Sequence, residues 1–390
     1  MKIAVAATRL VEKELARGID LSIVALINGL IFEAHALRAS DIHIDPTHSG
    51  VRIRLRIDGV LHELHQFPKS IHNEIVSRIK VLSGLRTDEH TASQDGRFRY
   101  RFPDLVEFLD MRVSIVPTYH GENAVLRLLV KQSGQQTLAN LGFSESDQTK
   151  LLAALKRPSG MLLATGPTGS GKTTTLYTLL SQLNVPEVSI VTIEDPIEYS
   201  IDGIEQIQVN SRSGLTFANG LRSILRQDPN IIMVGEIRDS ETASIAINTA
   251  LTGHLLLSTL HTSDAATTLP RLLDMGIDAY LVSSTVTLAV GQRLVRKICR
   301  ACKVKNIDDA FYTGAGCDVC QGSGYQGRVS INEVLVADEK IQAAILRRAP
   351  AVELKALAIT AGMTPMFEDG MKKVRSGDTT IEELLRVIHE

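Results

Sequence analysis

Tryptophan is missing from this 390-residue chain, and aromatic residues make up only 4% of it. Surfaces that stack the bases of single-stranded nucleic acid are built from aromatic side chains, so such a surface is not expected here. An excess of one charge is lacking too, because 42 Lys and Arg nearly balance 44 Asp and Glu. Polybasic nucleic-acid-binding proteins carry a large positive excess. We therefore expect no nucleic-acid partner.

Long hydrophobic runs are also absent. No stretch of 18 or more apolar residues occurs, and the two most apolar segments, 19–32 and 276–290, are too short or too interrupted to span a bilayer. The apolar N-terminal run, residues 3–7, is too short for a signal peptide. Cysteine is limited to four residues in two C-x-x-C pairs, a pattern that indicates metal binding in a cytosolic chain. These absences predict a soluble, multidomain, cytoplasmic protein.

Hydrophobic periodicity divides the chain into two parts. In the first part, residues 20–39 and 68–85 have helical spacing, and short strands are predicted at 40–45, 51–57, 96–102, 111–116 and 124–129. In the second part, apolar strands alternate with helical patterns, at 161–164, 189–193, 231–234 and 255–258. Such alternation predicts a parallel sheet covered by helices.

These patterns predict five segments. They are an N-terminal α+β domain at 1–131, a polar linker at 132–137, an α/β core at 138–298, a cysteine-rich insert at 299–327 and a helical region at 328–390. The helical assignment of the last segment rests on the spacing of apolar residues in 351–361 and 380–388.

A phosphate-binding motif follows the strand at 161–164. It matches G-x-x-x-x-G-K-[ST] and comprises Gly166, Pro167, Thr168, Gly169, Ser170, Gly171, Lys172 and Thr173, with Thr174 next in the helix. Glycines let backbone N–H groups converge on a phosphate, and the helix N-terminus favours negative charge there. We expect Lys172 to neutralise the β- and γ-phosphates of ATP and Thr173 to ligate Mg²⁺. The alternative is a glycine-rich turn with a solvated lysine.

Acidic and histidine side chains at other strand ends are candidates for the chemistry. Glu236 follows the strand at 231–234, where an attacking water would lie, and is our candidate for polarising it. The acidic run 194–198, which begins with Glu194, could tune the metal or the water indirectly. His254 and His261 flank the strand at 255–258, and their spacing alone favours a structural role for each.

The four cysteines have the spacing of a zinc site. Cys299 and Cys302 form one pair, Cys317 and Cys320 form the other, and 14 residues separate the pairs. Four thiolates make a closed tetrahedral Zn²⁺ site, which is structural because it leaves no open position. A redox-active pair is the alternative. A nucleic-acid-binding zinc ribbon also stays open, because basic residues lie nearby at 293, 296, 297, 300, 303 and 305.

Taken together, these segments resemble one family, the secretion ATPases of type II secretion and type IV pilus assembly (the GspE/PilB group). The segments that carry the resemblance are 166–177, 193–199, 225–239 and 252–262, with 40–43, 56–59 and 94–97 in the first region. The match covers roughly residues 20–390. Several ordered motifs make this resemblance specific.

The resemblance implies an α/β fold in which a RecA-like P-loop domain follows a smaller, PAS-like α+β domain. It implies a hexameric ring with ATP between the two lobes of each subunit, and a platform protein of the inner membrane as partner. It also implies that Glu236 assists hydrolysis, that Glu194 lies near the nucleotide, and that His254 and His261 are functional. The chain would then be peripheral at the inner membrane through its partners.

Arginines of the first region are candidates for contact with the nucleotide. Arg56 shares one face of a strand with Arg52 and Arg54, and Arg97 follows a turn at 95–96. The family match leads us to expect that Arg56 and Arg97 reach the ATP phosphates when the lobes close. Arg226 could act across a subunit boundary. A solvated sheet face is the alternative for all of them.

Two departures from the family pattern affect the choice of function. About 20 residues precede the first matched helix, whereas many relatives carry an extra N-terminal domain, so the mode of recruitment is open. The tetracysteine segment favours assembly or secretion over pilus retraction. A retraction motor, a DNA-translocating ATPase and a nucleotide-switched scaffold that does not hydrolyse ATP are the alternatives.

Overall fold

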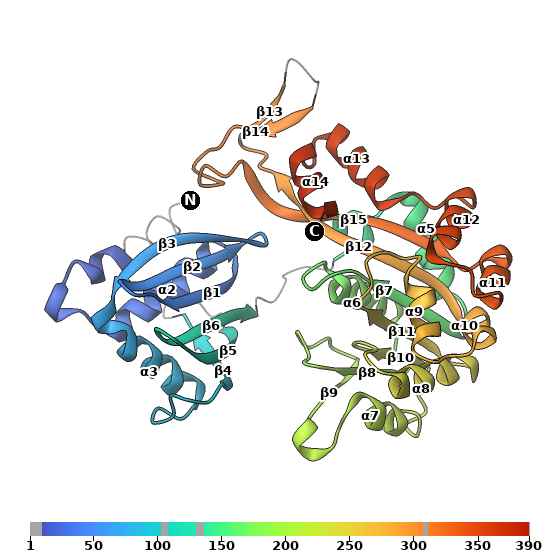
Figure 1. The fold of residues 1–390 in the computed structure, drawn as a ribbon, viewed down its shortest axis with the longest axis horizontal. Helices are drawn as coiled ribbons and strands as arrows, with labels where there is room; N and C mark the ends of the chain where they lie inside the picture. Colours follow the sequence, from blue (N-terminus) through green and yellow to red (C-terminus); the bar gives the residue numbers. More distant parts are fainter. Residues whose placement is uncertain (1–9, 103–107, 130–135, 307–310, 390) are drawn as a thin grey trace. The chain divides into compact units, whose positions relative to one another are not determined.

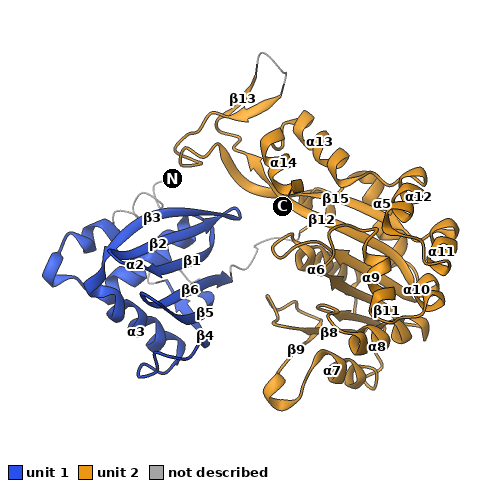
Figure 2. Ribbon diagram, in the orientation of Figure 1, with its two compact units in different colours: residues 1–133 blue, residues 134–390 orange. Residues whose placement is uncertain are grey.

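The computed structural model describes residues 10–102, 108–129, 136–306 and 311–389, and Figure 1 shows its fold. The chain divides into two compact units, residues 1–133 and 134–390 (Figure 2). The linker expected at 132–137 falls mostly on residues 130–135, which lie outside the described residues. Each unit has a hydrophobic core of its own.

Unit 1 is an antiparallel sheet packed against helices. Its six strands have the order β3-β2-β1-β6-β5-β4. The strands are β1 (Ala39–Pro46), β2 (Gly50–Ile57), β3 (Val60–Pro68), β4 (Gln94–Arg101), β5 (Phe108–Thr118) and β6 (Gly121–Leu129). The helical segments are η1 (Gly18–Asp20), α2 (Ile23–Ala36), η2 (Lys69–Ile71) and α3 (His72–Ser83).

Alternation along the strands of unit 1 separates a core face from a polar face. In β2, Ile53 and Leu55 are fully buried, whereas Arg54 points to the other face and donates to Asp45 across the sheet at 2.6 Å. The turn between β2 and β3 has positive φ at Asp58 (49°) and Gly59 (90°), which suits a tight hairpin. The strands and helices predicted for this region are present, with shifted ends.

Unit 2 is built on a seven-stranded mixed sheet with the order β15-β12-β7-β11-β10-β8-β9. Its strands are β7 (Gly160–Thr165), β8 (Ile190–Glu194), β9 (Glu205–Gln208), β10 (Ile231–Val234), β11 (Leu255–Leu260), β12 (Val286–Ile298) and β15 (Tyr325–Val336). Neighbours from β12 to β9 are parallel, and β15 is antiparallel to β12. All residues of β7, β8, β10 and β11 are buried, as the apolar runs predicted.

Helices cover both faces of this sheet. One buried cluster joins the sheet to α7–α12, and another joins it to α4–α6. The helices are α4 (Leu138–Leu141), α5 (Glu145–Leu155), α6 (Lys172–Leu183), η3 (Ser211–Ser213), α7 (Phe217–Ile224), α8 (Ser240–Leu251), α9 (Thr268–Asp274), α10 (Ala279–Thr285), α11 (Glu339–Leu346), α12 (Ala351–Thr360), α13 (Met366–Ser376) and α14 (Ile381–His389). Within the described residues, no helix is long and apolar enough to cross a membrane.

The boundary drawn at residue 328 for a helical region is wrong. Residues Tyr325–Val336 form β15, and the helices begin only at α11. The sequence did not indicate this strand because Asn332 and Glu333, which are polar yet fully buried, interrupt its apolar pattern. With β12, β15 makes a long ribbon whose far end carries the cysteines and a small sheet of β13 (Lys303–Lys305) and β14 (Tyr312–Gly314).

Candidate functional site

The phosphate-binding motif forms the turn between β7 and α6. Gly166, Gly169 and Gly171 have φ values of 141°, 80° and 90°, which residues with a Cβ rarely adopt. At Gly166 a Cβ would also lie 2.3 Å from the backbone oxygen of Gln292 in β12. Helix α6 begins directly after, at Lys172, so its N-terminus faces this turn. The turn has the backbone and the helix dipole that bind a phosphate.

Lys172 and Ser170 supply side-chain donors to the phosphate loop. The Nζ atom of Lys172 donates to the backbone oxygens of Gly166 at 2.7 Å and Pro167 at 3.0 Å. Burial lowers the pKa of Lys172 to about 8, and the negative charge of Glu236 partly opposes this. The buried Ser170 hydroxyl has no hydrogen-bond partner within the described residues. These donors fit the oxygens of a bound phosphate.

Glu236 lies beyond the C-terminal end of β10 and is 9% exposed. Its Oε2 atom is 2.7 Å from Nε of Arg238 and 3.3 Å from Nε2 of His261. Because β7, β11 and β10 are adjacent and parallel, their C-terminal ends meet at one edge. The structure therefore brings Lys172, Glu236 and His261 together.

His261 is held by the strand that leads into the phosphate loop. Thr262 donates its backbone N–H to Oγ1 of Thr165, the last residue of β7, at 3.0 Å. The Thr262 hydroxyl also lies 2.5 Å from the Thr165 hydroxyl. Arg238 and Thr262 lie within segments that carry the family resemblance, but the sequence alone did not show that Arg238 contacts Glu236 or that Thr262 is bonded to Thr165.

Glu194 ends β8, the strand beside β10, so it lies at the same edge of the sheet as Glu236. It is 2% exposed, and it accepts hydrogen bonds from Thr192 Oγ1 at 2.6 Å, Gln206 Nε2 at 3.2 Å and the Tyr177 hydroxyl. Burial and the charge of Glu194 raise the pKa of Tyr177. Within the described residues its carboxylate contacts neither Lys172 nor Glu236. These hydrogen bonds fix its carboxylate between β8, β9 and α6, and an indirect role of Glu194 at the nucleotide stays a prediction.

His254 lies at the other edge of the sheet from His261. It precedes the six-residue strand β11, and at about 3.3 Å per residue the two histidines are roughly 20 Å apart. His254 Nδ1 is 3.2 Å from the backbone oxygen of Thr249, and its backbone oxygen accepts from Gly160 at the start of β7. The two histidines thus lie at opposite ends of β11, and a functional role of His254 stays a prediction.

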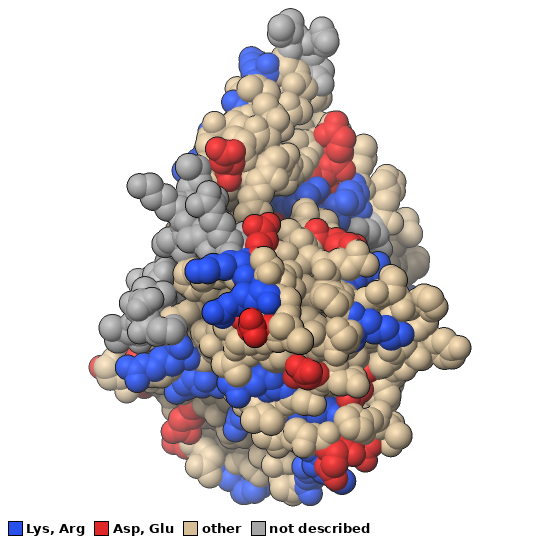
Figure 3. All heavy atoms as spheres, turned by 90° about the vertical axis from the view of Figure 1, so that its left-hand side faces the viewer, with Lys and Arg blue, Asp and Glu red and all other residues tan. Residues whose placement is uncertain are grey.

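The candidate arginines belong to unit 1. Nη1 of Arg56 donates to the backbone oxygen of Gly59 at 3.0 Å, and its Nε lies 3.6 Å from Asp41. Arg97, in β4, is exposed and pairs with no acidic group in the described part of the chain. Basic and acidic side chains are interspersed on the face drawn in Figure 3.

The cysteines form a second site. The Sγ atoms of Cys299, Cys302, Cys317 and Cys320 lie within 4.8 Å of one another. Three of the Sγ pairs are 3.7–3.9 Å apart. Tetrahedral Zn–S bonds of about 2.3 Å place sulfurs about 3.8 Å apart, so the four thiols fit zinc. The backbone N–H groups of Cys317 and Gly324 each lie 3.2 Å from Sγ of Cys320. The four cysteines would hold the ion as a structural crosslink at the end of the β12–β15 ribbon.

We expect the affinity for Mg-ATP to fall as the pH rises through about 8. Without nucleotide, Lys172 has a pKa of about 8, so the ammonium loses its proton above that pH. A bound triphosphate favours the charged form, so binding should then take up a proton and Kd should rise by about tenfold per pH unit. Calorimetric titration between pH 6.5 and 9.5 tests this. Lys172→Arg, which stays charged, is the control and should lack this trend. A constant parental Kd would contradict the assignment.

We expect one zinc ion per chain, measurable by elemental analysis of the purified protein. Cys317→Ser should lose the metal and destabilise the end of the ribbon, because three thiolates leave an incomplete site. ATP binding at the phosphate loop should persist. Asp318→Asn, an exposed change between the same two cysteines, should keep the zinc. A folded and active preparation without metal would show that the cluster is not a zinc site.

Comparison with known proteins identifies the family of this chain. The model of the family described as "Type II/IV secretion system protein" matches residues 19–386. The chain is 46% identical to type II secretion system protein E of Xanthomonas campestris pv. campestris, over 95% of this chain and 68% of that protein. It is 44% identical to the type IV pilus assembly ATPase PilB of Myxococcus xanthus, over 94% of this chain and 68% of that protein.

Solved structures with the same fold include a pilus retraction motor and an ATPase. The pilus retraction motor PilT with bound ADP gives a TM-score of 0.64 at 26% identity, covering 92% of this chain and 96% of PilT. The ATPase DotB of Legionella pneumophila gives a TM-score of 0.71 at 24% identity, over 92% of this chain and 94% of DotB. The sequence resemblance is thus confirmed. The chain belongs to the type II/IV secretion system protein family.

Proposed function

We propose that this chain is a Mg²⁺-dependent ATPase that powers the assembly of pilus or pseudopilus subunits and protein secretion. The observation that carries the proposal is the position of Glu236 beside the phosphate loop, within the field of Lys172 and in contact with His261. A carboxylate there can orient water for attack on a γ-phosphate. The high identity to a type II secretion protein E and to PilB supports the biological assignment.

In this proposal each residue of the site has one task. The loop 166–171 binds the triphosphate through backbone N–H groups, and Lys172 neutralises its β- and γ-oxygens. Mg²⁺, held by the Thr173 hydroxyl, would supply further charge neutralisation. Glu236 accepts a proton from water or orients it, while Arg238 and His261 fix the direction of its carboxylate.

The assignment to assembly over retraction rests on similarity and on the cysteines. Identity to PilB and to the secretion proteins is 44–46%, whereas identity to the retraction motor PilT is 26%. The tetracysteine cluster also favours assembly or secretion. We further propose a RecA-like unit 2, a PAS-like unit 1 and a homohexamer. Its location would be the cytoplasm, at a platform protein of the inner membrane.

Glu236→Gln should keep ATP and Mg²⁺ binding and lower hydrolysis by about a hundredfold or more. The amide has the same shape but cannot accept a proton, and positioned general bases contribute about 10²–10⁴ in rate. Phosphate release and nucleotide affinity are measured in parallel. The matched control is Glu241→Gln, an exposed position in α8 paired with Arg222, which should hydrolyse ATP at the parental rate. Hydrolysis by Glu236→Gln within about threefold of the parent would reject the proposed role.

Arg56→Ala and Arg97→Ala should each lower the ATPase rate of assembled hexamers tenfold or more. An arginine that stabilises the negative charge developing on the γ-phosphoryl group typically raises the rate of hydrolysis by about 10³–10⁵. Arg99→Ala is the control, because Arg99 lies on the same strand as Arg97 but is paired with Asp110 at 2.7 Å. If both variants form intact hexamers and hydrolyse ATP at the parental rate, Arg56 and Arg97 are only solvated residues on the face of the sheet.

A further inference from the structure

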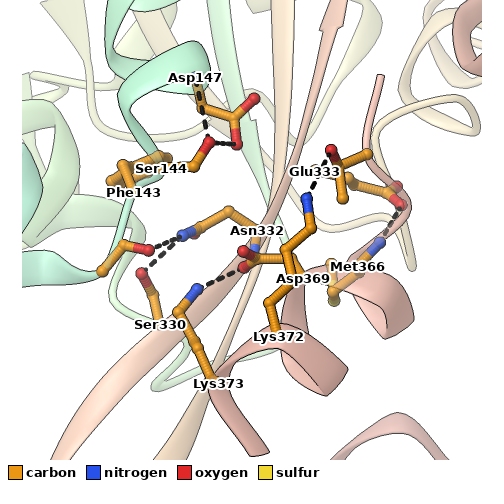
Figure 4. A network of polar contacts seen from close by, with 12 residues as sticks. Phe143, Ser144, Asp147, Ser330, Asn332, Glu333, Met366, Asp369, Lys372 and Lys373 are labelled. Carbon is orange, nitrogen blue, oxygen red and sulfur yellow. Dashed lines mark hydrogen bonds and ion pairs between the residues drawn. The ribbon is translucent and has the colours of Figure 1, made fainter. Parts of the chain in front are cut away.

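A fully buried carboxylate on β15 joins the loop after β11 to the C-terminal helices. Glu333 is 0% exposed and accepts from the backbone N–H of Ala265 at 2.9 Å and of Met366 at 3.2 Å. Met366 is the first residue of α13, and Figure 4 shows its contact with Glu333. Burying an ionised carboxylate is costly unless it is paired and hydrogen-bonded, so this group needs its partners.

Lys355, on α12, supplies the positive partner. Its Nζ atom lies 2.9 Å from Oδ2 of Asp264 and 3.7 Å from Oε2 of Glu333. Burial alone would lower the pKa of Lys355, but these two carboxylates raise it above its ordinary value. One ammonium group therefore connects helix α12 with β15 and with the loop after β11.

Several hydrogen bonds and an ion pair hold the loop after β11, residues 261–265. Asp264 accepts at Oδ1 from the backbone N–H of Thr267 at 2.9 Å, close to the start of α9. At one end of the loop Thr262 is bonded to Thr165, and at the other Ala265 is bonded to Glu333. His261 lies in this loop, 3.3 Å from Glu236. Its position is thus set by contacts on both sides.

We infer that Lys355 is a positioning residue for ATP hydrolysis: by pairing with Asp264 and Glu333 it fixes the loop 261–265, and with it the contact of His261 with Glu236. Lys355 touches neither the phosphate loop nor Glu236, so it acts through the loop alone. Helix α12 thereby gains an influence on the hydrolysis rate. This inference rests on the proposed ATPase function.

The first test compares Lys355→Met with Lys355→Arg. Methionine keeps an apolar stem and loses the charge, and we expect kcat to fall about fivefold or more with KM for ATP changed less than about twofold, since misplacing a catalytic group impairs the chemical step. Arginine keeps the charge and should restore most of the rate. A parental kcat for Lys355→Met overturns the inference.

A matched control separates positioning from support of the C-terminal helices. Lys150, on α5, donates to the backbone oxygen of Gly362 at 2.9 Å and pairs with Asp147, but does not reach the loop 261–265. Lys150→Met should leave kcat unchanged. An equal loss in Lys150→Met and Lys355→Met overturns the inference, because the effect would then be general destabilisation.

A second variant tests the same ion pair and keeps the inference testable if Lys355→Met does not fold. Asp264→Asn removes the ion pair but keeps a side-chain oxygen that can accept from Thr267, since asparagine is as good a helix cap as aspartate. It should reproduce the kcat loss of Lys355→Met. In a His261→Ala background, Lys355→Met should add little, because both act on one contact. Fully additive losses overturn the inference. Failure of the proposed function is seen separately, as the absence of ATP hydrolysis in the parental protein.

Discussion

The ammonium group of Lys172 and the carboxylate of Glu236 lie in the same largely buried site of unit 2, where the two residues are 8% and 9% exposed. Charges this far from water need partners, and each of these has them: backbone oxygens for Lys172, Arg238 and His261 for Glu236. The order of the sheet makes the arrangement possible. Because β11 lies between β7 and β10, the residues that follow these three strands meet at one edge.

The β12–β15 ribbon supports this edge from the side. Gln292, on β12, accepts from Thr175 Oγ1 in α6 at 2.8 Å, and its backbone approaches Gly166 so closely that a larger residue would clash. Glu333, which lies on β15 opposite Gly291 of β12, holds the loop after β11. The cysteines lie at the far end of the same ribbon. The ribbon thus contacts the phosphate loop and the loop 261–265 and carries the tetracysteine cluster at its far end.

Local motifs could be predicted from the sequence, and spatial neighbours could not. The phosphate loop is one continuous run, and the cysteines form two C-x-x-C pairs within one short segment, so both could be predicted from spacing. The sequence could not show that His254 and His261 lie at opposite ends of β11, or that Tyr177 and Gln206 contact Glu194. Strand β15 was missed because its buried polar residues interrupt the apolar pattern. Gln292, Glu333 and Lys355 become visible only when distant segments are packed together.

Phosphate release from ATP by the purified full chain tests the central claim most directly, since it separates an enzyme from a nucleotide-switched scaffold. Release should continue over many turnovers, require Mg²⁺, and vanish in Lys172→Ala. Such turnover would show that the site formed by Lys172, Glu236 and His261 performs hydrolysis. Tight ATP binding without release of phosphate, under conditions in which the protein is folded and assembled, would contradict the account.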